Sequence, residues 1–122
     1  MCKGLGLDLC GISRMEALLR DERFLNRYFT PAETAYVHAK GAGAAQTLAG
    51  LYAAKEAVLK AMGVGIALPL QEVEIFHGSG GQPQVRLTGR AAQQLADMGG
   101  GSFLLTITHE GDTAAAAALW QA

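Results

Sequence analysis

The sequence predicts a single α+β domain in which an antiparallel sheet packs against a long central helix. The chain has 122 residues, 50% of them hydrophobic and 17% charged, which is enough for one core but too little for a second domain. Several short segments alternate between apolar and polar side chains as strands do, whereas residues 44–62 have helical spacing. No internal repeat or linker divides the sequence, so the expected domain spans residues 1–122.

The first element is predicted to be a strand over residues 3–12, with Asp8 on one of its faces. The opposite face carries Leu5, Leu7 and Leu9. Residues 13–16, Ser-Arg-Met-Glu, match a capping box, so a helix is expected to begin directly after this strand.

Residues 21–29 are predicted to form a polar and aromatic connection. Residues 30–33, Thr-Pro-Ala-Glu, form a second capping box, in which Pro31 occupies a position where a missing N–H costs nothing. The helix that begins there is expected to end at Gly41 and Gly43.

The longest helix is predicted to run from about Ala44 to Met62 and to end against Gly63. Lys55 projects toward its bulkiest apolar stripe, so this side chain must either extend to solvent or find a partner. Glu56 and Lys60 are neighbours one turn apart on another face.

The C-terminal half is predicted to begin with a hairpin of residues 72–76 and 85–87. Residues 90–98 indicate a short helix, and residues 103–109 indicate a further strand. The last segment, residues 113–120, is ambiguous because alanine favours helix, yet the preceding Glu-Gly-Asp sequence favours a tight turn. We predict a closing antiparallel strand.

Composition excludes several classes of protein. The net charge is −1, with 8 basic and 6 acidic residues in positions 1–60 and 2 basic and 5 acidic residues in positions 61–122. This distribution lacks the basic surface that a nucleic-acid-binding protein needs. Cys2 and Cys10 are too few for a disulfide framework, so free thiols in a reducing compartment are expected. No leader or membrane-length apolar run is present, which predicts a soluble, cytoplasmic protein that binds no membrane.

Two acidic residues are candidates for chemistry. Asp8 lies on a strand beside a helix start, and Glu56 interrupts an alanine-rich helix. Together, two carboxylates on separate elements could hold Mg²⁺, which takes one or two carboxylates and completes its shell with water and phosphate oxygens. Separately, each also fits an ordinary role: Asp8 as a surface acid, and Glu56 with Lys60 as an exposed pair worth about 0.2–0.5 kcal/mol.

The neighbouring residues suit a phosphate group. Lys60 can place an ammonium on phosphate oxygens, and the backbone at Gly63 and Gly65 can approach an anion closely. The glycines do not have the spacing of the known nucleotide-binding loops.

His109 shares a face with the apolar residues of its strand, so it fits either a hydrogen-bonded structural residue or a ligand contact. His38 and His77 are predicted to be surface residues. The basic and aromatic cluster over residues 14–28 could be solvated, or it could receive an acidic helix. No local pattern indicates a Ser-His-Asp or Cys-His site.

Two motifs nevertheless resemble those of a known family, the bacterial holo-[acyl-carrier-protein] synthases, which are short phosphopantetheinyl transferases. Residues 6–14 read Gly-Leu-Asp-Leu-Cys-Gly-Ile-Ser-Arg, similar to G-x-D-[IL]-x-x-[IVL]-x-R. Residues 52–65 are similar to F-A-x-K-E-A-x-x-K-A-x-G-x-G. The resemblance extends to Thr30 and Glu33 and to a closing Thr-x-Thr-His sequence that ends at His109.

The resemblance implies a phosphopantetheinyl transferase fold and transfer of phosphopantetheine from coenzyme A to a serine of apo acyl carrier protein, for fatty acid biosynthesis. The products would be the holo carrier and adenosine bisphosphate. Asp8 and Glu56 would hold Mg²⁺ with the diphosphate, and either Glu56 or a metal-ordered water would accept the serine proton. Lys60, also assigned to catalysis, would lie near phosphate with Gly63, Gly65 and Ile66, and His109 would lie near the nucleotide.

Members of this size resemble one another in forming homotrimers with the site at the subunit interface. The resemblance also assigns an acidic carrier helix to a docking surface that consists of Arg14, Arg20, Arg23 and Phe24. Leu51 stands where the family usually has a basic residue, which leaves carrier preference open. A carrier from a polyketide or peptide pathway stays possible, as does a non-catalytic module that binds a nucleotide or carrier.

Overall fold

The computed structural model describes the backbone of all 122 residues and every side chain except that of Ile66. The helices and strands follow one another as β1 (Cys2–Gly11), α1 (Ile12–Glu16), α2 (Glu22–Tyr28), α3 (Pro31–His38), α4 (Ala44–Met62), β2 (Val73–His77), β3 (Pro83–Leu87), α5 (Gly89–Asp97), β4 (Ser102–Glu110) and β5 (Thr113–Gln121). Three 3₁₀ turns join some of them: η1 (Gly41–Gly43), η2 (Gly65–Ala67) and η3 (Leu70–Glu72).

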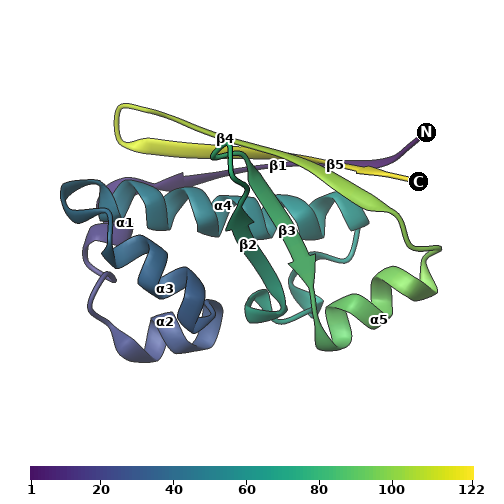
Figure 1. The fold of residues 1–122 in the computed structure, drawn as a ribbon, viewed down its shortest axis with the longest axis horizontal. Coiled ribbons are helices and arrows are strands. Elements are labelled where there is room, and N and C mark those ends of the chain that lie inside the picture. Colours follow the sequence, from purple (N-terminus) through teal and green to yellow (C-terminus); the bar gives the residue numbers. More distant parts are fainter.

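The molecule is built in layers around α4. A three-stranded antiparallel sheet in the order β1-β5-β4 lies on one side of this helix. The helices α1 to α3, the two-stranded β2-β3 hairpin and α5 lie on the other side (Figure 1). The predicted α+β class with a central helix is therefore confirmed, although the predicted antiparallel strands form two sheets.

Small residues allow α4 to lie very close to the sheet. A Cβ atom at Gly4 or Gly6 of β1 would collide with the carbonyl oxygens of Ala61 and Ala57 in α4. The inward-facing alanines of β5 are buried for the same reason. This close packing explains why residues 113–120 form a strand despite their high helix propensity, because tertiary contacts outweigh the intrinsic preference of alanine.

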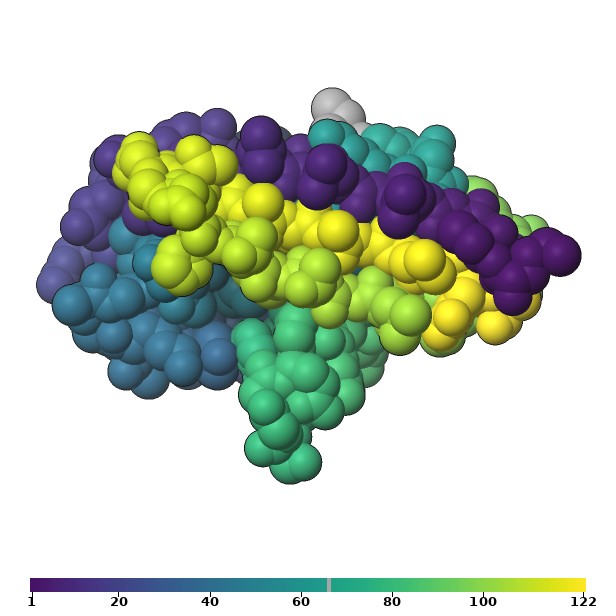
Figure 2. Space-filling view, turned by 90° about the horizontal axis from the view of Figure 1, so that it is seen from above, coloured from purple at the N-terminus to yellow at the C-terminus, as the bar shows by residue number. Residues whose placement is uncertain are grey.

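The alternation of β1 is confirmed, but its leucine face points away from the core. Leu5, Leu7 and Leu9 are 70%, 62% and 65% exposed, and Leu104 of β4 is 57% exposed on the same outer face. Seen from above, the three strands lie side by side without a helix over them in the described part of the chain (Figure 2). The inward positions belong instead to the glycines, Asp8 and Cys10.

Lys55 has found a partner inside the protein. Its side chain is fully buried, and Nζ lies 2.7 Å from Glu33 Oε1. Nζ also donates hydrogen bonds to the carbonyl oxygens of Leu70 at 2.9 Å and Val73 at 2.8 Å. Glu33 Oε2 accepts a further hydrogen bond from Ile75 N–H at 2.7 Å. Burial lowers the pKa of Lys55, and the Glu33 carboxylate opposes this shift.

Two local predictions in the N-terminal half are wrong. Ser13 does not cap α1; its N–H and hydroxyl both donate to Asp112 Oδ1, at 3.0 and 2.7 Å, because the distant β4-β5 turn lies beside this helix start. Residues 21–29 contain the helix α2, whose cap is Asp21, the acceptor of Phe24 N–H at 3.1 Å. The signal for this helix start is local, because aspartate is one of the preferred N-cap residues.

The other predicted elements are confirmed with small changes in their ends. The capping box of α3 is complete, with Thr30 and Glu33 each accepting a backbone hydrogen bond from the other. The helix α4 has the predicted limits, and the hairpin, α5, β4 and β5 are all present. Within the described residues, no helix has the length and apolar character needed to cross a membrane.

Candidate active site

The packing of β1 against α4 brings Asp8 to Lys60. The glycines at positions 4 and 6 lie against successive turns of α4, and Asp8 is the next inward-facing residue of β1. Its Oδ1 atom lies 2.7 Å from Lys60 Nζ, which also donates to the Leu7 carbonyl oxygen at 3.1 Å. The hydrogen bond and charge of Asp8 raise the pKa of Lys60. Lys60 therefore pairs with Asp8 rather than with Glu56.

Glu56 lies on the same side of α4, close to both Cys10 and Tyr52. Burial raises the pKa of the Cys10 thiol; Arg14 opposes this shift, while the charges of Asp8 and Glu56 add to it, so both carboxylates lie near one thiol. Burial, followed by the charge of Glu56 and a hydrogen bond to it, raises the pKa of Tyr52 to about 12. Two carboxylates and one ammonium thus converge from β1 and α4.

A hollow opens beside Glu56, and we call it the Glu56 hollow. It is lined by Arg27, Tyr28, Tyr52, Glu56, residues 67–70 and Arg90. The Lys55 hydrogen bond to the Leu70 carbonyl oxygen holds one wall in place from inside the protein. The hollow has a volume of ≈ 400 Å³, which is in the range of pockets that bind small molecules.

The residues after α4 form a tight turn at its C-terminal end. Gly63 has φ 74° and Gly65 has φ 59°, both in the left-handed region that favours glycine. Gly63 N–H donates back to the carbonyl oxygen of Lys60 at 3.0 Å, which closes the helix. The predicted phosphate contact of the Ile66 side chain lies outside the described residues.

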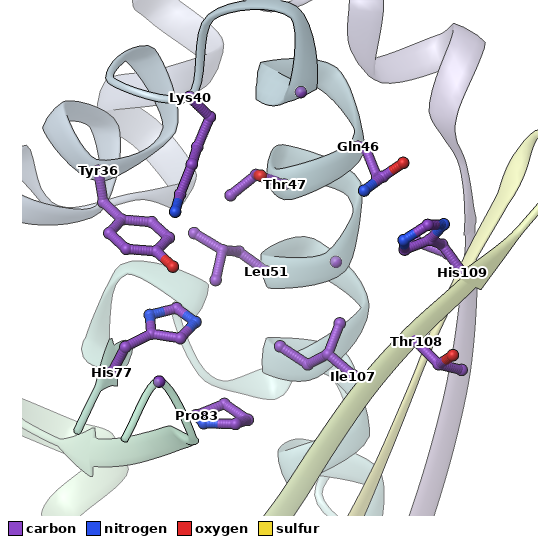
Figure 3. Close-up of a pocket in the computed structure, with 14 residues that line it drawn as sticks. Tyr36, Lys40, Gln46, Thr47, Leu51, His77, Pro83, Ile107, Thr108 and His109 are labelled. Carbon is purple, nitrogen blue, oxygen red and sulfur yellow. The ribbon is translucent and has the colours of Figure 1, made fainter. Parts of the chain in front are cut away.

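His109 lies in a different hollow, on the opposite side of α4. This His109 hollow is lined by Tyr36, Lys40, Thr47, His77, Pro83 and His109, among others (Figure 3). Thr47 and Glu56 are nine positions apart, so at about 100° per residue they point in opposite directions from the helix. Asp8 and His109 also lie on the two edge strands of the sheet. Within one chain, the structure does not bring His109 to Asp8 and Glu56.

The His109 hollow has an aromatic and cationic wall. His77 stacks on Tyr36 with the ring centroids 4.3 Å apart and an interplanar angle of 10°. Lys40 Nζ lies 4.5 Å from the Tyr36 ring. Burial and the charge of Lys40 lower the pKa of His77. His77 is partly exposed, as expected of a surface residue, but its ring also forms part of the hollow, and Leu51 is buried beneath the same hollow.

The predicted docking residues divide into two groups. The Arg14 guanidinium lies 5.6 Å from the Tyr52 ring, and the Phe24 ring lies 6.1 Å from it, so both flank the residues around Glu56. Arg20 and Arg23 line a separate hollow at the start of α2, together with His38. His38 Nε2 lies 2.9 Å from the Leu19 carbonyl oxygen.

The two carboxylates suit a hard cation that needs few protein ligands. Among the described residues, no group of three or more His, Cys, Asp or Glu side chains is placed to hold a metal ion. Asp8 already has a positive charge, that of Lys60, on one oxygen. Mg²⁺ bound by one or two carboxylates, with water and phosphate oxygens as its other ligands, fits this donor set, whereas a closed structural metal site does not.

Comparison with known proteins is consistent with this geometry. Residues 4–118 match the sequence model of the 4'-phosphopantetheinyl transferase superfamily. A holo-[acyl-carrier-protein] synthase of Treponema denticola is 44% identical over 117 residues, which are 95% of each chain. The crystal structure of the Neisseria meningitidis synthase superimposes with a TM-score of 0.89 at 28% identity over 100% of both chains.

The Helicobacter pylori synthase, whose crystal structure contains coenzyme A, has a TM-score of 0.82 at 26% identity, covering 96% of this chain and 99% of that one. The fold and the matched residues thus define the class: the chain belongs to the 4'-phosphopantetheinyl transferase superfamily. Within this superfamily, it is an enzyme of the holo-[acyl-carrier-protein] synthase group.

Proposed function

We propose that the chain transfers phosphopantetheine from coenzyme A to a serine hydroxyl of apo acyl carrier protein, with Mg²⁺, in fatty acid biosynthesis. The serine oxygen would form a new bond to the phosphorus that carries pantetheine. The bond between this phosphorus and the oxygen that bridges to the second phosphate of coenzyme A would break, which would release adenosine bisphosphate. The observation that carries this proposal is the convergence of Asp8, Glu56 and Lys60 from β1 and α4.

Each residue has a physical role in the proposed reaction. Asp8 and Glu56 would hold the metal ion, which supplies charge neutralisation for the diphosphate when bound. Lys60 would share its ammonium between Asp8 and a phosphate oxygen, and the backbone at Gly63 and Gly65 would lie against the same phosphate. Glu56 lines the hollow beside it, so its carboxylate can accept the serine proton directly. Such transfer depends mainly on alignment and charge neutralisation.

The proposal is tested by weighing the carrier. Apo acyl carrier protein is incubated with the enzyme, coenzyme A and Mg²⁺, and its mass is measured. A gain equal to one phosphopantetheine group is expected, and a chelator should prevent it. Apo carriers from polyketide and peptide pathways are tested in parallel, since the carrier class is open. No gain with any carrier would leave only a binding module of this fold.

Replacing Lys60 with alanine is expected to raise the KM for coenzyme A roughly tenfold or more, since a hydrogen bond to a charged group contributes about 1.5–3 kcal/mol. Initial rates at varied coenzyme A and saturating carrier measure this effect. Lys60→Arg, which keeps the charge, should lose less. Unchanged KM and kcat in Lys60→Ala would disprove the phosphate role.

We further propose that the enzyme is a homotrimer with its sites between subunits. Two features support this assembly. His109 and Glu56 lie on opposite sides of α4, so one nucleotide could contact both only if they belong to different chains. The outer face of the sheet exposes a row of leucines, and an exposed apolar patch of this kind is typical of a surface that another subunit covers.

Mixing two inactive variants tests the shared site. The variants Glu56→Gln and His109→Glu are denatured together and refolded as a 1:1 mixture. In randomly assembled trimers, roughly a quarter of the interfaces combine an intact Glu56 from one subunit with an intact His109 from its neighbour. The mixture should therefore regain roughly a quarter of wild-type activity. Light scattering measures the oligomer in the same samples. A mixture with no more activity than its components would mean that both residues act within one chain.

A further inference from the structure

The Glu56 hollow contains more positive charge than the proposed reaction uses. Arg27 of α2 and Arg90 of α5 both line it, and Glu56 is the single carboxylate among its lining residues. Both arginines are exposed. In the part of the chain whose side chains are described, neither guanidinium forms an ion pair. Two cations therefore face this hollow and lack a fixed counter-charge.

The Arg27 side chain packs on an aromatic ring at the edge of the hollow. The Arg27 guanidinium lies 5.3 Å from the Tyr28 ring, and this ring lies 6.1 Å from that of Tyr52, which lines the same hollow. An arginine that packs on an aromatic ring keeps its hydrogen-bond donors free for another group.

The position of Arg90 is set by the start of α5. Thr88 N–H donates to the Glu72 carbonyl oxygen at 2.9 Å, and Ala91 N–H donates to Glu72 Oε1 at 3.0 Å. These two hydrogen bonds tie both sides of Arg90 to η3, which continues from the wall of the hollow at residues 67–70. The backbone of Arg90 is thus fixed beside the hollow although Arg90 lies 34 positions later in the sequence than Glu56.

We infer that Arg27 and Arg90 bind a carboxylate of the acceptor protein next to the serine that is modified. This inference rests on the proposed function, in which the donor phosphates lie at Asp8 and Lys60, on the β1 side of Glu56. The hollow gives a second approach to the Glu56 carboxylate. An acidic acceptor supplies the missing counter-charge, whereas the uncharged pantetheine arm would leave both guanidiniums without a partner.

This assignment extends the predicted docking surface. The predicted docking residues all belong to the α1-α2 region, so by themselves they would contact the acceptor on one side only. They are Arg14, Arg20, Arg23 and Phe24. Arg90 adds a contact from α5, across the hollow. Two contacts on opposite sides of the reacting serine would fix its approach to Glu56, so the arginines act as specificity-determining residues for the acceptor.

The test measures acceptor and donor constants separately. Arg27→Ala and Arg90→Ala are each expected to raise the KM for apo carrier roughly two- to fivefold at low salt, since both groups are exposed, and the double variant should exceed either alone. The effect should shrink as salt increases. The KM for coenzyme A should stay at the wild-type value. Ala96→Glu, an exposed change on α5 with the same charge difference as Arg90→Ala, serves as the control and should change neither constant.

A charge exchange provides a second readout. Arg90→Glu should bind the acidic carrier still less well, and a carrier in which an acid beside the serine is changed to lysine should recover part of this loss. An increase in the KM for coenzyme A instead would place the donor in the hollow and overturn the inference, as would unchanged constants in the double variant. If wild-type enzyme transfers nothing to any carrier, the proposed function itself fails, which is a distinct result.

Discussion

Replacing Glu56 with glutamine is expected to abolish phosphopantetheine transfer, with a loss of at least about 10²–10⁴ in kcat, the usual contribution of a positioned acid or base. Glutamine keeps the shape of the side chain but cannot accept the serine proton, and it is a weaker ligand for a divalent cation. The measurement is the rate of mass gain of apo carrier at saturating coenzyme A. Asp8→Asn should cause a loss of similar size, because it removes the other carboxylate and the ion pair with Lys60.

The loss must come from chemistry and not from unfolding. Glu56 is only partly buried and contributes to no ion pair among the described side chains, so circular dichroism and the urea midpoint of Glu56→Gln should match wild type. Asp97→Asn makes the same chemical change at an exposed position of α5 and should stay fully active. Wild-type rates in Glu56→Gln or Asp8→Asn would refute the assignment of these residues.

Replacing Lys55 with methionine is expected to destabilise the protein by about 3–5 kcal/mol, because Glu33 would then be a buried charge without its partner. Two carbonyl oxygens, those of Leu70 and Val73, would also lose their donor. The free energy of unfolding, measured by urea titration, shows this effect. Such a loss is a large fraction of the stability of a small domain.

Lys55 lies next to Glu56 in the sequence, so the role of Lys55 must be separated from catalysis. Lys40→Met makes the same change at an exposed position, where only the contact with the Tyr36 ring is lost, so its stability should stay within about 1 kcal/mol of wild type. Combining Lys55→Met with Glu33→Gln should cost less than the sum of the single changes, since each removes the same interaction. Additive losses, or a wild-type urea midpoint for Lys55→Met, would show that the buried pair contributes little.

Local signals were sufficient for most elements of the fold. The capping box at Thr30 and the glycines after Met62 both act within a few residues, and both helix ends lie where they were predicted. The start of α1 failed because its partner, Asp112, is 99 positions away from Ser13. The leucine face of β1 was identified correctly as one face, but period alone does not say which face meets the core. The glycines opposite α4 decide this.

The candidate site divides in the same way. Asp8, Glu56 and Lys60 could be selected from the two motifs, because their residue types and spacing suit a metal and phosphate. In the sequence, Arg27 is one member of the basic cluster over residues 14–28, and Arg90 carries no signal beyond its charge. Both became candidates because the structure places them in the hollow beside Glu56.

The amino-acid sequence by itself determined the order of the helices and strands apart from α2, the class of enzyme and a short set of polar candidates, because periodicity, caps and motifs are encoded over neighbouring residues. Only the tertiary structure decided which partners these residues meet. Lys60 could have paired with Glu56 one turn away, yet it pairs with Asp8 on another element; Lys55 pairs with Glu33; and His109 is separated from Glu56 by the width of α4. Each of these outcomes depends on how distant elements pack together, which no local pattern specifies. The Asp8–Lys60 pair, for example, depends on the close approach of α4 to β1 that Gly4 and Gly6 allow.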